Sequence, residues 1–160
     1  MIKVFGIGNL LLSDDGIGVK VVEELKNKIT TINDNIEVFV GETDYLYCLD
    51  NICEEDFIII VDGTYFETHL GKVTVLSFEE CDEFIQYSSN SHDENLLKIL
   101  RLETPQIKGA LIGIEIGRIG YSLELSPELQ DKFTTICTYV LAEVRNLSSK
   151  ITKKNKYSLL

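Results

Sequence analysis

Aspartate and histidine side chains, which can bind divalent metal ions, lie beside the predicted strands and helices of this sequence. Asp14 and Asp15 lie in the stretch GIGNLLLSDDGIG, Asp62 follows the apolar run FIIIV, and His92 lies in the polar stretch SSNSHDE. Carboxylates and an imidazole suit zinc, nickel or a similar cation, with one coordination position left open to water or substrate. Ligands in open α/β sheets bind beyond the carboxyl ends of the strands, so these three loops can converge on one cation there.

Each of these residues also has a purely structural interpretation, and spacing does not choose between the two. Asp14 or Asp15 can cap the helix that follows, because acids favour helix N-termini. Asp62 can open an Asx-turn, and His92 can be a solvated residue of a polar loop. His69, the other of the two histidines, is expected on the surface.

The elements that must position these residues alternate between strand-like and helix-like patterns. Apolar runs predict strands, and apolar residues spaced three or four apart predict helices. The strands are expected at residues 2–7, 36–40, 57–62, 72–78 and 110–116, and the helices at residues 17–29, 45–52, 92–102 and 127–147. The run FIIIV is typical of a central strand covered on both faces, and KVTVLSF suits a strand nearer an edge. The alternation predicts an α/β fold with three layers, in which helices cover both faces of a mostly parallel, twisted sheet.

Two of the helices begin with capping signals. Ser91-x-x-Glu94 matches a capping box, which would place His92 in the first helical turn. The positive end of the helix dipole favours neutral imidazole there, the form that binds metals. Ser126 followed by Pro127 is a standard start for the last helix.

Length and charge narrow the classes of function. The 160 residues fit one α/β domain, expected at residues 1–146, with a polar tail at 147–160 that frays. A net charge of −11 argues against a nucleic-acid partner, because such binding rests on cations that neutralise phosphates. No apolar run approaches the roughly 20 residues of a membrane span, and no signal peptide is visible. We therefore expect a cytoplasmic protein with no membrane partner, and a monomer.

Other common site types do not match the sequence. Gly6 and Gly8 lack a third glycine in the register of a dinucleotide-binding loop, and the acids that follow would repel a pyrophosphate. There is no G-x-S-x-G motif of a serine hydrolase. The four cysteines form no C-x-x-C pair and are expected to be reduced and mostly packed.

The stretch GIGNLLLSDDGIG resembles the amino-terminal signature of the hydrogenase maturation endopeptidases, whose fold is phosphorylase/hydrolase-like. IIIVDG, SHDENLL, GIEI and LSPEL resemble later motifs of that family in the same order. The resemblance implies that Asp15, Asp62 and His92 surround a metal position and are the catalytic residues, and that Asp14 is a structural acid. The sequence departs from the family pattern at Glu42, Gly63 and Ile116, none of which replaces a ligand.

The resemblance implies removal of a C-terminal peptide from the nickel-loaded precursor of a nickel-iron hydrogenase large subunit. Nickel would come with the substrate, and zinc or cadmium could substitute for it in a crystal. Asp15, Asp62 and His92 would recognise that nickel, or hold a metal that activates water, or supply an aspartate as general base. The alternative is a non-catalytic module on the same scaffold, which senses nickel or another divalent metal or mediates an interaction.

Overall fold

The computed structural model of the protein describes residues 1–87 and 95–157 and contains five strands, five α-helices and one 3-10 helix, η1, within those ranges. The elements are β1 (Ile2–Ile7), η1 (Ser13–Gly16), α1 (Ile17–Thr30), β2 (Ile36–Glu42), α2 (Tyr45–Asp50), β3 (Phe57–Thr64), β4 (Val73–Ser77), α3 (Phe78–Tyr87), α4 (Leu96–Glu103), β5 (Lys108–Glu115) and α5 (Pro127–Tyr157). None of the helices in these two ranges is both long enough and apolar enough to span a membrane.

The strands form one sheet in the order β2-β1-β3-β5-β4. β1 pairs in parallel with β2 and β3, and β3 pairs in parallel with β5, whereas β4 runs antiparallel along the outer side of β5. This confirms the predicted mostly parallel sheet, with β3 in the middle and β4 at an edge. The carboxyl ends of β1, β2, β3 and β5 therefore lie along the same side of the sheet, which we term the carboxyl edge.

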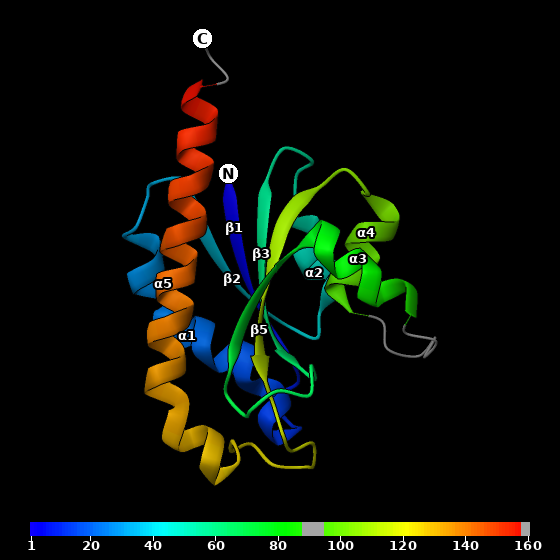
Figure 1. The fold of residues 1–160 in the computed structure, drawn as a ribbon, viewed down its shortest axis with the longest axis vertical. Coiled ribbons are helices and arrows are strands. Elements are labelled where there is room, and N and C mark those ends of the chain that lie inside the picture. The colour runs from blue at the N-terminus through cyan, green and yellow to red at the C-terminus, as the bar shows by residue number, and fades with distance from the viewer. Residues whose placement is uncertain (88–94, 158–160) are drawn as a thin grey trace.

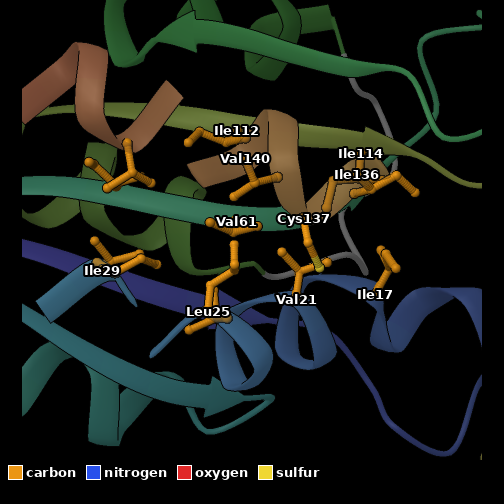
Figure 2. Packing of buried hydrophobic residues seen from close by; sticks show 14 of the residues in the cluster. Ile17, Val21, Leu25, Ile29, Val61, Ile112, Ile114, Ile136, Cys137 and Val140 are labelled. Carbon is orange, nitrogen blue, oxygen red and sulfur yellow. The ribbon is translucent and has the colours of Figure 1, made fainter. Parts of the chain in front are cut away.

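Helices α1 and α5 cover one face of the sheet (Figure 1). The apolar stripe predicted from Ile17 to Ile29 is buried on α1, because residues three or four apart share one face of a helix. Figure 2 shows Leu25 of α1, Val61 of β3 and Val140 of α5 in this layer of the core. This packing fixes the start of α1 against the end of the central strand.

Helices α2, α3 and α4 cover the opposite face, which completes the predicted three layers (Figure 1). Ile58 and Ile60 of β3 point into this second layer, where they pack with Phe78 and Leu100. Side chains alternate along a strand, so Asp62 continues the row of Ile58 and Ile60 on the same face.

Two helix boundaries differ from the prediction. Helix α4 begins at Leu96, and the Asn95 side chain caps it by accepting a hydrogen bond from the Lys98 backbone at 2.8 Å. The predicted start of this helix at Ser91 is therefore wrong. Residues 88–94, which include His92, lie outside the described residues.

Helix α3 was not expected, although its start carries the same kind of signal. The Ser77 backbone donates to Glu80 Oε2 at 2.7 Å, and the Glu80 backbone donates to Ser77 Oγ at 3.2 Å. This is a reciprocal capping box, which the sequence SFEE encodes. At the other end of the chain, α5 continues to Tyr157, so most of the residues expected to form a frayed tail are helical.

Candidate active site

Asp15 lies in η1, the short turn that leads from β1 into α1. Its Oδ2 accepts a hydrogen bond from the Asn9 backbone at 2.8 Å, which closes the loop after β1. The N-cap of α1 is Gly16, and no side chain makes a capping hydrogen bond there. The capping interpretation of Asp14 and Asp15 is therefore wrong for α1.

Asp14 is fully buried, and its carboxylate contacts the segment between β5 and α5. Its Oδ1 accepts from the Ser126 backbone at 2.6 Å, and its Oδ2 accepts from Ser126 Oγ at 3.0 Å and from the Arg118 backbone at 2.9 Å. Ser126 thus donates its hydroxyl to Asp14. The expected structural role of Asp14 is confirmed, and its effect is to tie the first loop to residues 117–126.

Asp62 is partly buried and lies near the end of β3. Its Oδ1 accepts a hydrogen bond from the Gly63 backbone at 2.8 Å, while the strand continues to Thr64. The alternative interpretation, in which Asp62 opens an Asx-turn, is therefore wrong. The side chain projects from a regular strand, which fixes its position more firmly than a loop would.

Glycines bring the loop of Asp15 against the strand of Asp62. A Cβ on Gly18 would lie 2.3 Å from Val61 O, 2.4 Å from Ile7 O and 2.9 Å from Asp62 Cα, so only glycine permits this approach of α1 to β1 and β3. Gly8 has φ of +134°, and a Cβ there would lie 2.0 Å from Asp15 O. These glycines serve backbone packing rather than a phosphate cradle.

The two carboxylates interact electrostatically. Burial raises the pKa of Asp62 from 3.8 to about 7, and the negative charge of Asp15 raises it as well, against the hydrogen bond from Gly63, which lowers it. A carboxyl group with a pKa near neutral pH can accept or donate a proton in solution near pH 7. A buried acid with a perturbed pKa beside a second acid is typical of a catalytic site.

A third loop, between β3 and β4, borders the same acids. Burial and the charges of Asp15, Asp14 and Glu115 raise the pKa of Tyr65, in that order of effect. Glu115 is buried and holds this loop, because its Oε2 accepts from the Phe66 backbone at 2.8 Å and its Oε1 accepts from the Thr68 backbone at 3.1 Å. The sequence analysis missed both residues; a buried acid within the strand motif GIEI was the available signal for Glu115.

Strained backbone also gathers at the carboxyl edge. Ser13, Glu42 and Glu67 have φ values of 57°, 49° and 57°, in the left-handed region that favours glycine. Each conformation costs about 1–2 kcal/mol. Glu42 is the last residue of β2, and Ser13 and Glu67 follow β1 and β3. Strain that surrounding structure maintains in this way is common at active sites.

The remaining candidate residues do not join Asp15 and Asp62 in the described structure. His69 is exposed, as expected, beside α5 residues such as Asp131 and Lys132. Within residues 1–87 and 95–157, no three His, Cys, Asp or Glu side chains gather where they could hold a metal ion. All four cysteines are free, and three of them are buried, as expected.

Comparison with known proteins shows the family to which this chain belongs. The profile of the HycI family, described as hydrogenase maturation protease, matches residues 19–143, a range that includes Asp62. The hydrogenase 2 maturation protease of Escherichia coli is 27% identical over 150 residues, which cover 90% of each chain. The solved structure of the hydrogenase maturating endopeptidase HybD from E. coli has a TM-score of 0.71 and 26% identity, and the match covers 91% of this chain and 92% of that one. A hydrogenase maturation protease, HybD, from Thermococcus kodakarensis shares the fold, with a TM-score of 0.65, 21% identity and coverage of 89% and 98%. The chain belongs to the HycI family of hydrogenase maturation proteases and is an endopeptidase of this type.

Proposed function

We propose that the protein removes a C-terminal peptide from the nickel-loaded precursor of a nickel-iron hydrogenase large subunit, with Asp15, Asp62 and His92 at the reacting centre. The observation that carries this proposal is the packing of the loop of Asp15 against the strand of Asp62 at the carboxyl edge of the sheet, which the close approach at Gly18 permits. Family membership supports the reaction class. The assignment of His92 rests on the resemblance of SHDENLL to the family motif, because this residue lies outside the described residues.

The two aspartates suit a cation that arrives with the substrate. Asp15 Oδ2 and Asp62 Oδ1 each accept one backbone hydrogen bond, and within the described residues no further hydrogen bond to the second oxygen of either carboxylate is found. These oxygens and the His92 imidazole would supply three ligands to the nickel of the precursor. Three protein ligands leave coordination positions open, and the ligands that a precursor-bound ion already carries would fill them. Nickel recognition would then restrict cleavage to loaded precursors.

In the alternative in which the cation does not bind Asp62, this residue acts as the general base of the hydrolysis. With a pKa of about 7, its carboxylate can accept a proton from water near neutral pH. The water oxygen bonds to the carbonyl carbon of the scissile peptide, the C–N bond breaks, and the proton passes to the leaving amine. A divalent cation bound beside that carbonyl would polarise it.

A cleavage assay tests the proposal. The protein is incubated with its nickel-loaded and its nickel-free precursor, and the products are weighed by mass spectrometry. We expect loss of a C-terminal peptide only from the loaded precursor, and no loss with the Asp62→Asn variant. Asp34→Asn, which changes an exposed acid near the opposite edge of the sheet, is the matched control and should cleave normally.

Two results would contradict the proposal. Equal cleavage of nickel-free precursor would remove the role of nickel, and full activity of Asp62→Asn would remove the role of the acid pair. Nickel binding that His92→Ala weakens, without proteolysis of any precursor, would instead favour the non-catalytic metal-sensing module.

A further inference from the structure

Asp15 belongs to η1, a 3-10 helix in which three successive side chains have different surroundings. Ser13 is 1% exposed and Asp14 is fully buried, whereas Asp15 is partly exposed. A 3-10 helix has about three residues per turn, so successive side chains point about 120° apart around its axis. The contacts of Ser13 and Asp14 therefore determine the direction in which the Asp15 carboxylate points.

The segment between β5 and α5, residues 117–126, holds both of these buried side chains. Ser13 Oγ donates a hydrogen bond to Glu124 O at 3.0 Å, and the Ser13 backbone donates to Ser122 O at 2.8 Å. The Asp14 carboxylate accepts its three hydrogen bonds from the same segment. Two successive side chains of η1 are thus fixed against one segment, and this leaves the third side chain, Asp15, directed elsewhere.

The backbone of Ser13 has an unfavourable conformation that these contacts maintain. Its φ of 57° lies in the left-handed region, where a residue with a side chain is strained. The Asp15 backbone, two residues later, donates to Leu12 O at 3.3 Å across the same turn. A different φ at Ser13 would rotate η1 and would move the Asp15 carboxylate with it. The Ser13 hydroxyl therefore helps to hold a backbone angle on which the placement of Asp15 depends.

The direction of Asp15 matters because the other acid of the pair is fixed on a strand. Asp62 projects from β3, and burial together with the charge of Asp15 raises the pKa of Asp62. Asp15 Oδ2 accepts its hydrogen bond from the Asn9 backbone at 2.8 Å. A rotation of η1 would break this bond and change the separation of the two carboxylates. At a reacting centre, a misplacement of about 1 Å can lower the rate roughly a hundredfold.

We propose that Ser13 is a positioning residue for the cleavage reaction, which holds η1 in the rotation that places the Asp15 carboxylate beside Asp62. This inference rests on the proposed function, because that function gives Asp15 its place at the reacting centre. Ser13 is too deeply buried to contact the precursor, so it acts through Asp15. The affinity for a whole protein substrate is spread over a large interface, so loss of the Ser13 hydroxyl should lower kcat much more than it changes KM.

Two substitutions at Ser13 separate positioning from stability. Ser13→Ala removes the hydroxyl and keeps the strained angle, whereas Ser13→Gly removes the hydroxyl and relieves the strain, so the glycine variant should be the more stable of the two in urea. Both variants should lower kcat for the nickel-loaded precursor about tenfold or more, with KM changed by less than about threefold. The control, Thr31→Ala, removes a hydroxyl that donates to Lys28 O at 2.8 Å at the far end of α1, and should keep both parameters.

The outcomes separate this inference from the proposed function. If the wild type does not cleave the precursor, the proposed function fails, and the inference fails with it. If the wild type cleaves and both Ser13 variants keep its kcat, only the inference is overturned. A kcat that falls in the alanine variant alone, in step with its lower stability, would also overturn it, because the hydroxyl would then only stabilise the fold. A low kcat in a glycine variant as stable as the wild type would support it.

Discussion

Replacing Asp62 by asparagine should make the metal-free protein more resistant to unfolding at neutral pH, although it should abolish cleavage. The reason is the pKa of Asp62, which burial and the charge of Asp15 raise from 3.8 to about 7 in the folded state. Asparagine has nearly the same shape, carries no charge, and keeps an oxygen that can accept the hydrogen bond from the Gly63 backbone. The variant therefore isolates the free-energy cost of an ionised carboxylate at this position.

The direction in which stability changes with pH follows from how many protons the folded and unfolded states bind. Between pH 4 and pH 7 the unfolded chain releases the Asp62 proton while the folded protein retains it, so the free energy of unfolding falls as the pH rises. Below the pKa that Asp62 has in the unfolded chain, its ionisation does not affect the free energy of unfolding. Above the pKa that it has in the folded protein, the effect stays constant. The slope is about 1.4 kcal/mol per pH unit for a single fully shifted group. Since Asp62 is partly buried and water reduces the effect, we expect the wild type to lose about 1–2.5 kcal/mol relative to the variant between pH 5 and pH 8.

Urea unfolding followed by circular dichroism, with a chelator present, measures this difference at each pH. The chain has no tryptophan, so ellipticity is the suitable signal. Because the quantity is a change with pH, a constant offset between the two side chains cancels. Asp15→Asn should weaken the pH dependence, since the charge of Asp15 contributes to the raised pKa. A stability difference that is the same at pH 5 and pH 8 would refute the electrostatic account of the acid pair.

Three further substitutions test the surrounding structure. Thr64 Oγ1 is buried and, within the described residues, has no hydrogen-bond partner. Thr64→Val should therefore raise the free energy of unfolding by about 1 kcal/mol in urea titrations. A lower free energy of unfolding would show that the hydroxyl is hydrogen-bonded. Gly18→Ala places a Cβ 2.3 Å from Val61 O, so it should lower the free energy of unfolding by about 1–3 kcal/mol and also lower kcat. Gly120→Ala, whose Cβ would meet no atom within 4 Å, is the control and should change neither quantity. Equal melting curves for the two variants would contradict the packing argument. Asp14→Ala leaves three donors without their acceptor, two of them buried, and should lower the free energy of unfolding by roughly 3 kcal/mol in the same titration. An unchanged melting temperature would contradict this expectation.

The strands could be predicted from the sequence because burial on two faces leaves a plain signature. The run FIIIV has no polar residue to interrupt it, and it forms the first part of β3, which lies between two parallel neighbours. The stripe from Ile17 to Ile29 identified α1 for the complementary reason, since one face of that helix meets the sheet. Local patterns suffice where the environment of a segment is uniform along its length.

Helix starts depended on contacts that a short motif does not specify. The chain contains Ser-x-x-Glu at Ser77 and at Ser91, and the structure forms the reciprocal capping box at the first, with α4 beginning beyond the second. The two stretches, SFEE and SHDE, carry the same serine and glutamate and differ in that only the first contains an apolar residue, Phe78. The helix begins after Ser77 because β4 ends there and because Phe78 is buried in the core, and both depend on tertiary contacts.

The roles of the adjacent acids could be divided only by family resemblance or by structure. Asp14 and Asp15 are identical in type, and the partners of Asp14 lie 104 and 112 residues away in the chain. The grouping of Asp15 with Asp62 agrees with the shared carboxyl edge that the parallel sheet predicted. His92 lies outside the described residues, and its role stays a prediction.

The buried carboxylate of Asp14 has a consequence for the synthesis of this enzyme on the ribosome. Its three donors belong to Arg118 and Ser126, so the nascent chain cannot form these hydrogen bonds until translation has passed the last strand. An amino-terminal fragment that ends before residue 117 contains Asp15 and Asp62 but not the donors that hold their loop. Proteolytic competence therefore arises late in translation, after most of the protein has been made.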